Sequence, residues 1–231
     1  MRWVAAATAL ALLACGCAAG EEETFVPGDA PAGNASAGNP SAGNASAAPR
    51  TAGGEAEGSS SSGPRVEKVS AAPGMTVVIE WPSGLAPEQQ AMIKAYADYY
   101  THVWGAIATG GRDVSYGTTV EGMATRSAYE WVRSFMERAN AAKGTVRVYA
   151  LRVAAVVGRG AEVDACVDRS GVRVTDAATG RATAVQPAWT KGTQAVHFQA
   201  AGVRRGDDGT WRVANLRYAE HPDERAKECV R

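Results

Sequence analysis

Residues that could carry out acid–base chemistry lie close together between positions 96 and 113 of the 231-residue chain. Tyr100 is two positions from Asp98, and Asp113 follows within the same stretch. A tyrosine hydroxyl can donate a hydrogen bond to an oxygen that gains negative charge, while a carboxylate carries the proton. Tyr100, Asp98 and Asp113 are therefore the candidate catalytic residues.

Tyr100 and Asp98 belong to a predicted helix that begins at Pro87 and ends before Gly110, and Asp113 follows the end of this helix. Proline is favoured at the first helical position, and apolar residues then recur every three or four positions. The apolar positions are Ile93, Tyr96, Tyr100, Val103, Trp104 and Ile107. Such a stripe is typical of a helix face that packs in a core, whereas Asp98 lies on the polar side. We therefore interpret the stripe as core and keep a catalytic Tyr100 as the alternative.

A second helical region is predicted from about Thr118, where Thr118 and Glu121 have capping-box spacing, to Gly144. The period then changes to two, which is typical of β-strands. The expected strands are 145–157, 161–168, 171–174, 187–204 and 210–218, after a first, edge strand at 75–81. Helices followed by hairpins favour an α+β domain, with the helices packed on one face of a curved antiparallel sheet.

The residues of these elements resemble a known family. Tyr96-Ala97-Asp98-Tyr99-Tyr100, Cys166-Val167-Asp168 and Pro187-Ala188-Trp189-Thr190 resemble segments of secreted and lipid-anchored proteins of actinobacteria. These proteins are grouped with the NTF2-like superfamily, which includes SnoaL-type cyclases and ketosteroid isomerases. The resemblance implies an NTF2-like cone with an open, apolar mouth over roughly residues 85–230. In an isomerase-like site of this kind, Tyr100 would act with Asp98 or Asp113.

The N-terminus has the features of an export signal. Arg2 precedes an uncharged run that ends at Leu13 and is too short to span a membrane. Leu12-Leu13-Ala14-Cys15 resembles the lipobox of bacterial lipoproteins, in which the cysteine sulfur receives a diacylglyceryl group. We therefore expect a signal peptide at 1–14 and an acylated Cys15, with Cys17 as the fallback site. Two acyl chains would anchor the protein on the extracytoplasmic face of the cell membrane.

Residues 15–65 are rich in Ala, Gly, Asn, Ser and Pro, and they include a repeated pentapeptide at 32–46. Such a composition buries too little apolar surface to offset the entropy lost on ordering. We therefore expect a disordered tether with a root-mean-square span of roughly 35 to 45 Å. The folded NTF2-like domain is expected over 66–231.

Cys166 and Cys229 are the cysteines that remain outside the N-terminal signal region. Because an exported domain lies in an oxidising compartment, we predict a disulfide between them.

Two acids flank Cys166 at alternate positions of the same predicted strand. Asp164 and Asp168 therefore face one side of that strand. Calcium needs six or more oxygen ligands, which these two acids do not supply. We expect ion pairs with Arg147 or Arg173 instead of a metal site.

Composition and motifs restrict the function further. Residues 66–231 carry 21 Lys and Arg against 18 Asp and Glu, without the basic stripe typical of nucleic-acid-binding proteins. The sequence has no Gly-rich phosphate loop, Cys-x-x-Cys pair or Gly-x-Ser-x-Gly elbow, and its three histidines are dispersed. We expect no metal, cofactor or nucleic-acid partner. The domain is interpreted as a membrane-tethered binding module for a small apolar ligand or an envelope protein; the alternative is a SnoaL-type isomerase, cyclase or hydrolase.

Overall fold

The computed structural model describes residues 65–231. The predicted signal peptide, both candidate lipidation sites (Cys15 and Cys17) and the tether up to residue 64 lie outside the described residues. Within residues 65–231, no helix is both long and apolar enough to cross a membrane.

The described range contains seven β-strands, three α-helices and three short 3₁₀ helices. The strands are β1 (Arg65–Ala72), β2 (Met75–Trp81), β3 (Asn140–Val157), β4 (Gly160–Asp168), β5 (Val172–Asp176), β6 (Val196–Arg205) and β7 (Trp211–Glu220). The α-helices are α1 (Pro87–Ala108), α2 (Gly122–Met136) and α3 (Glu224–Lys227). Short 3₁₀ turns lie at η1 (Ser115–Thr118), η2 (Ala188–Thr190) and η3 (Gly192–Ala195).

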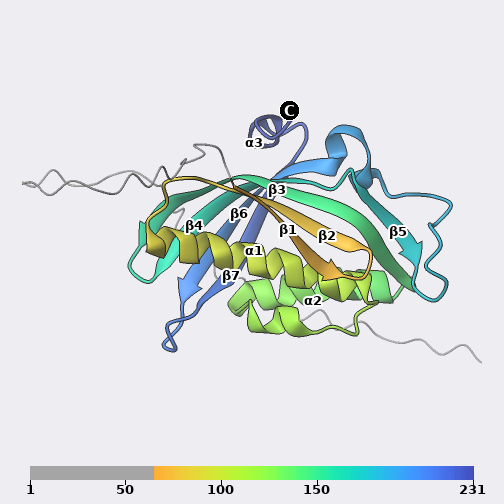
Figure 1. Ribbon diagram of the computed structural model, residues 1–231, viewed down its shortest axis with the longest axis horizontal. Helices are drawn as coiled ribbons and strands as arrows, with labels where there is room; N and C mark the ends of the chain where they lie inside the picture. Colours follow the sequence, from red (N-terminus) through yellow and green to blue (C-terminus); the bar gives the residue numbers. More distant parts are fainter. Residues whose placement is uncertain (1–64) are drawn as a thin grey trace, which may run out of the picture. The chain divides into compact units, whose positions relative to one another are not determined.

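All strands join one sheet in the order β1-β2-β3-β4-β6-β7, and β5 pairs with the first part of β3. Neighbouring strands are antiparallel except β2 and β3, which run parallel and are connected through α1 and α2. Figure 1 shows the sheet curving over α1 and α2, while α3 lies on the opposite face. The predicted α+β class, with helices packed on one face of a curved and mostly antiparallel sheet, is confirmed.

The core lies between α1 and the concave face of the sheet. Tyr96, Tyr100 and Trp104 on α1 are each at most 1% exposed. The Trp104 ring packs edge-on against Tyr100 at 6.3 Å and against Trp131 of α2 at 5.2 Å. Burying a large apolar side chain contributes about 1.5–3 kcal/mol. The aromatic stripe is therefore core, as its helical spacing predicts.

The long strand β3 has an irregularity in its pairing with β4 that bends the strand. The register between β3 and β4 shifts between Tyr149 and Arg152, where Ala150 has a φ of 51°. A bulge of this kind bends a strand and increases its local twist. Near its start, β3 also passes close to another backbone segment: a Cβ added at Gly144 would lie 2.1 Å from the carbonyl oxygen of Gly171.

The strand at Met75–Trp81 is interior rather than the edge strand that the sequence predicts. β1 pairs along its outer side, from Arg65 opposite Trp81 to Ala72 opposite Met75. β1 is the edge strand, and its residues alternate between exposed and partly buried. It therefore lacks the apolar run by which the other strands are predicted from the sequence.

The second helix is shorter than predicted at both ends. It begins at Gly122 with Glu121 in the N-cap position, so Thr118 does not start a capping box. Thr118 instead closes η1, where its hydroxyl donates to the carbonyl oxygen of Ser115. The helix ends at Met136 because residues 140–144 pair with β5. Most of the predicted strand start at 187–195 also forms 3₁₀ turns.

The predicted disulfide between Cys166 on β4 and Cys229 after α3 is confirmed. It lies on the convex face of the sheet, in a small apolar cluster with Tyr149. Arg231 adds two contacts there: its guanidinium lies 3.8 Å from the centre of the Tyr149 ring and pairs with Glu80 at 2.8 Å. Covalent and non-covalent contacts therefore hold the segment after β7 to this face.

The acids of β4 have different partners from those predicted. Asp164 pairs with Arg152 at 2.8 Å, and not with Arg147 or Arg173. Arg152 stands directly opposite Asp164 in the β3–β4 ladder, whereas the guanidinium of Arg173 donates to backbone carbonyls. Asp168 accepts a hydrogen bond from a backbone N–H of the turn that follows β4.

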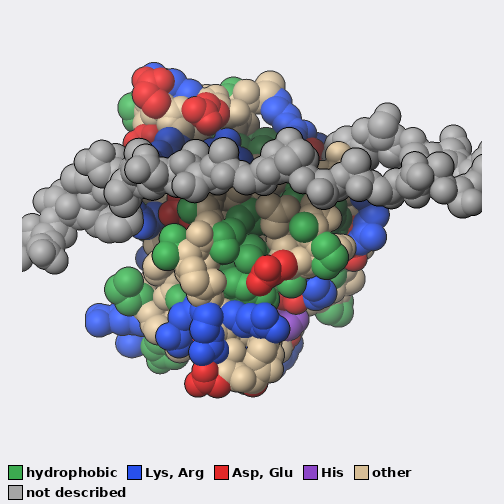
Figure 2. All heavy atoms as spheres, turned by 90° about the vertical axis from the view of Figure 1, so that its left-hand side faces the viewer, with side chains coloured by type: hydrophobic (Ala, Val, Ile, Leu, Met, Phe, Trp, Pro, Cys, Tyr) green, Lys and Arg blue, Asp and Glu red, His purple; other side chains and the backbone are tan. Residues whose placement is uncertain are grey.

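The β3–β4 and β6–β7 turns lie on the left in Figure 1, and Figure 2 views the molecule from that side. Lysine and arginine side chains gather at the lower end of this face, with acidic side chains nearby. Among the arginines of these turns and strands, Arg159 pairs with Asp207 at 2.7 Å and Arg212 with Asp208 at 2.5 Å. Part of this positive charge is therefore balanced locally.

Candidate functional site

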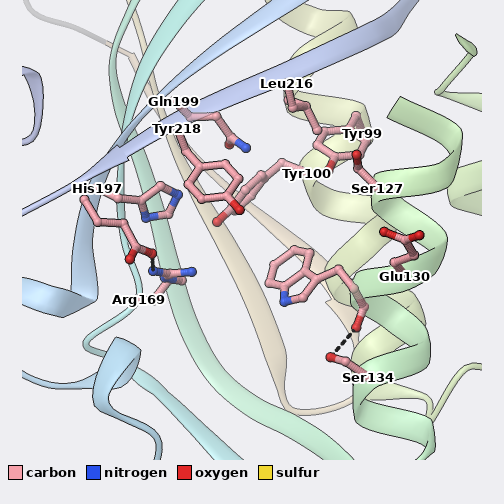
Figure 3. A pocket seen from close by; sticks show the side chains of 12 residues that line it. Tyr99, Tyr100, Ser127, Glu130, Ser134, Arg169, His197, Gln199, Leu216 and Tyr218 are labelled. Atoms are coloured by element: carbon pink, nitrogen blue, oxygen red, sulfur yellow. Dashed lines mark hydrogen bonds and ion pairs between the residues drawn. The ribbon is translucent and has the colours of Figure 1, made fainter. Parts of the chain in front are cut away.

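A cavity of about 450 Å³ opens between the concave face of the sheet and the helices α1 and α2. Figure 3 shows the side chains that line it: Tyr99, Tyr100, Ser127, Glu130, Trp131, Ser134, Arg169, His197, Gln199, Leu216, Tyr218 and Glu220. Small-molecule sites have volumes of about 300–1,000 Å³, and this one falls within that range. We call it the Tyr100 cavity.

Strand alternation brings polar side chains of β6 into the Tyr100 cavity. His197 and Gln199 are two positions apart and both face the helices, while Phe198 between them packs in the cluster on the convex face. The antiparallel register places Glu220 of β7 opposite His197, and Tyr218 opposite Gln199. Two neighbouring strands therefore supply one wall.

The helices and the end of β4 complete the cavity. Tyr100 comes from α1 and Trp131 from α2. Arg169 follows the last residue of β4, and its backbone N–H donates to the carbonyl oxygen of Ala195 at 2.9 Å. Its guanidinium lies 5.2 Å from the centre of the Trp189 ring. The cavity thus combines aromatic walls with a buried cation.

Several polar atoms in this cavity are buried without a hydrogen-bond partner among the described residues. They are the Tyr100 hydroxyl, His197 Nδ1, and Arg169 Nε and Nη2. Gln199 differs, because its Oε1 accepts a 2.6 Å hydrogen bond from the Tyr96 hydroxyl. Leaving a buried polar group unpaired costs about 1–3 kcal/mol. These groups are therefore available to a ligand at little further desolvation cost.

Burial and the charge of Arg169 set the protonation of the neighbouring groups. Burial raises the pKa of Tyr100 to about 12, although the nearby Arg169 cation opposes this shift. Burial, together with the nearby Arg169 cation, lowers the pKa of His197 to about 3. At neutral pH the cavity therefore contains a protonated tyrosine, a neutral imidazole and one buried cation.

The predicted carboxylates lie away from Tyr100. Asp98 pairs with Lys94 at 2.5 Å on the solvent side of α1, and it lines a separate groove of about 490 Å³. Asp113 accepts a 2.8 Å hydrogen bond from the backbone N–H of Ser115, which holds the pKa of this carboxyl below its ordinary value. The structure therefore brings Tyr100 into the cavity without Asp98 or Asp113.

Within residues 65–231, no group of three or more His, Cys, Asp or Glu side chains is placed to hold a metal ion.

The cavity residues that sequence reasoning missed include the three buried polar residues Arg169, His197 and Gln199. His197 and Gln199 occupy alternate positions of a strand whose following residues, such as Ala201, are core. Polar residues on the core side of a strand are informative because they are rarely buried. That signal was present in the sequence, but it needed the strand register to show which side faces the helices.

No protein-family profile and no curated protein sequence matches this chain. Solved structures with similar folds include the intermembrane space region of the chloroplast protein ARC6, with 10% identity and a TM-score of 0.42 over 59% of this chain and 99% of that chain. A ketosteroid isomerase-like protein from Erwinia carotovora has 18% identity and a TM-score of 0.35, over 60% and 100% of the two chains. ActVI-ORFA from Streptomyces coelicolor has 12% identity and a TM-score of 0.37, over 58% and 98%.

Proposed function

We propose that this chain is a membrane-tethered lipoprotein whose NTF2-like domain binds a small molecule in the Tyr100 cavity without chemically changing it. The observation that carries the proposal is a set of hydrogen-bonding side chains buried inside aromatic walls. Tyr100, Arg169, His197 and Gln199 are each less than a tenth exposed. A ligand that forms hydrogen bonds with the unpaired groups offsets the free-energy cost of burying them without partners.

Binding is favoured over catalysis because the groups that could act as a base are poorly suited to that role. Glu130 and Glu220 line the cavity, but their side chains are 58% and 55% exposed. A general base works best with a pKa near the working pH, and the pKa of His197 is about 3.

The alternative is a SnoaL-type enzyme that uses Tyr100 with Asp98 or Asp113. It would need both groups at one substrate atom, but Asp98 lines a different groove and Asp113 is bonded in the loop after α1.

Native mass spectrometry tests the binding proposal. The purified protein is incubated with an envelope extract, and bound small molecules are identified by their mass. Leu216 lines the cavity, so Leu216→Trp should fill part of it and abolish the bound species. Val157→Trp is the matched control, because Val157 is 79% exposed on the β3–β4 hairpin and should leave binding intact.

The same experiment can refute the proposal in two ways. Equal amounts of bound species on wild type and Leu216→Trp would place binding outside the Tyr100 cavity. Recovery of a chemically changed ligand would favour the enzymatic alternative. We expect wild type and Val157→Trp to carry a chemically unchanged ligand, and Leu216→Trp to carry none.

The membrane anchor is tested separately through the N-terminal cysteines. Cells grown with alkyne palmitate should label the protein, and Cys15→Ala should abolish the label. Cys17→Ala is the matched control and should keep it, since Cys15 follows the lipobox residues Leu12-Leu13-Ala14. Loss of the label only in Cys17→Ala would move the acylated residue to the fallback site, and no label on wild type would remove the anchor.

A further inference from the structure

The buried polar groups of the Tyr100 cavity are mainly hydrogen-bond donors, whereas its two carboxylates, Glu130 and Glu220, are exposed. A guanidinium has five N–H donors and no acceptor. The Oε1 of Gln199 is already engaged by the Tyr96 hydroxyl, so its amide presents its N–H groups. The Tyr100 hydroxyl is buried and has no partner among the described residues. A matching ligand group must therefore be rich in acceptor oxygens.

Arg169 also carries a positive charge that its surroundings balance incompletely. Its side chain is 10% exposed, and the nearest carboxylate oxygen, Glu220 Oε1, lies 3.6 Å from Nη2. That distance is beyond hydrogen-bond range, and the Glu220 side chain is 55% exposed to water. Nε and Nη2 together form one edge of the guanidinium, which matches the two oxygens of a carboxylate. Figure 3 shows Arg169 at the side of the cavity next to His197.

The cavity also has apolar surface away from Arg169, although Ser127, Glu130 and Ser134 of α2 line it too. Tyr99 and Trp131 lie on the helix side, and Leu216 lies on β7. They provide contact surface for a ring or a short hydrocarbon body rather than for a second charge.

Resting on the proposed binding function, we propose that the ligand of the Tyr100 cavity is an amphipathic carboxylate. Its carboxylate binds Arg169, with Tyr100 and Gln199 as further donors, and its apolar body lies between Tyr99 and Trp131. Glu220 competes with the ligand for the same guanidinium.

The test compares three probes that share one ring system and differ in charge. These are 2-naphthoate, the neutral 2-naphthamide and the cationic 2-naphthylmethylammonium, titrated by calorimetry into the full-length protein. Naphthoate should bind at least about tenfold more tightly than naphthamide, because bonds to a charged group are the stronger ones. The ammonium probe should bind most weakly.

Substitutions at the two charges should act in opposite directions. Arg169→Gln should reduce naphthoate affinity to the level of naphthamide, and Glu220→Gln should raise it severalfold by removing the competing carboxylate. Arg217→Gln is the matched control and should change neither, because Arg217 is exposed and lies between cavity residues on the other side of β7. If Arg169→Gln fails to fold, the probe series on wild type and the Glu220→Gln variant still decide the question.

Equal binding of naphthoate and naphthamide to wild type would overturn the carboxylate inference while leaving the binding function in place. The same conclusion would follow if Arg169→Gln kept the preference for naphthoate. If no probe binds and envelope extract also leaves the protein without ligand, the binding function itself fails. Tight naphthoate binding that Arg169→Gln abolishes and Glu220→Gln strengthens is the expected result.

Discussion

Removal of the disulfide between Cys166 and Cys229 is expected to lower the free energy of unfolding by about 4 kcal/mol. The perturbation is the double substitution Cys166→Ala and Cys229→Ala. It is made in a chain that also carries Cys15→Ala and Cys17→Ala. The chain has four cysteines, so the parent of this comparison retains only the disulfide pair.

The magnitude follows from the loop that the disulfide closes. The two cysteines are separated by 63 positions. Cross-linking a loop of this size restricts the unfolded chain, and the chain-entropy relation gives about 4 kcal/mol at 25 °C. Total stabilities of domains are about 5–15 kcal/mol, so the loss is a large fraction. The Arg231–Glu80 ion pair on the same face is part-exposed and cannot replace it.

Urea denaturation followed by tryptophan fluorescence measures the effect. With an m-value of about 2 kcal/mol per molar urea, the midpoint should fall by about 2 M. The parent treated with reductant should behave like the double variant, which controls for the loss of the two sulfur atoms. A midpoint change below about 0.3 M in both samples would refute the loop-entropy reasoning, since it would mean that the cross-link restricts the unfolded chain very little.

Three further predictions concern the cavity and the backbone. Tyr96→Phe removes the donor to Gln199 Oε1, so the free energy of unfolding should fall by about 1–3 kcal/mol in a urea titration, and an unchanged midpoint would contradict this. His197 takes up a proton near pH 6.5 when unfolded but near pH 3 when folded, so stability should decline as the pH falls through this window, by up to about 1.4 kcal/mol per unit. His197→Gln should flatten that slope in urea titrations at several pH values, and an equally steep slope in the variant would place its origin elsewhere. Gly144→Ala should abolish soluble expression for two reasons: the added Cβ would lie 2.1 Å from the carbonyl oxygen of Gly171, and the backbone φ of residue 144 is 112°. Gly158→Ala has open space at a φ of 55° and should lower stability by only about 1–2 kcal/mol; equal yields and melting temperatures for the two variants would count against the clash.

The first helix could be predicted almost to the residue, because its signals are local. Pro87 and the apolar spacing determine α1, and Gly110 and Gly111 follow its end with φ values of 64° and 80°. The start of the second helix was harder to predict, because Thr118 and Glu121 fit a capping box that the 3₁₀ turn excludes. β1 was not predicted because its stability comes from pairing with β2 rather than from an apolar pattern of its own.

The cavity was less predictable than the fold, because it joins residues far apart in the sequence. Tyr100 was identified from its residue type and place on α1. Its neighbours Arg169 and His197 reach it only through the β4–β6 register and the curvature of the sheet. Asp98 was chosen as a partner by proximity in sequence, but a separation of two positions on a helix turns the side chains to different faces.

Because β3 pairs with β2, β4 and β5, the order in which the sheet assembles depends on this strand. The β1–β2 and β6–β7 hairpins are local and need only short loops to close. Joining β2 to β3 closes a long loop that contains α1 and α2, and contacts of such long sequence separation slow folding. Docking of β3 is therefore the expected rate-limiting step, and truncation of the buried Val146 or Val148 should slow refolding more than it speeds unfolding.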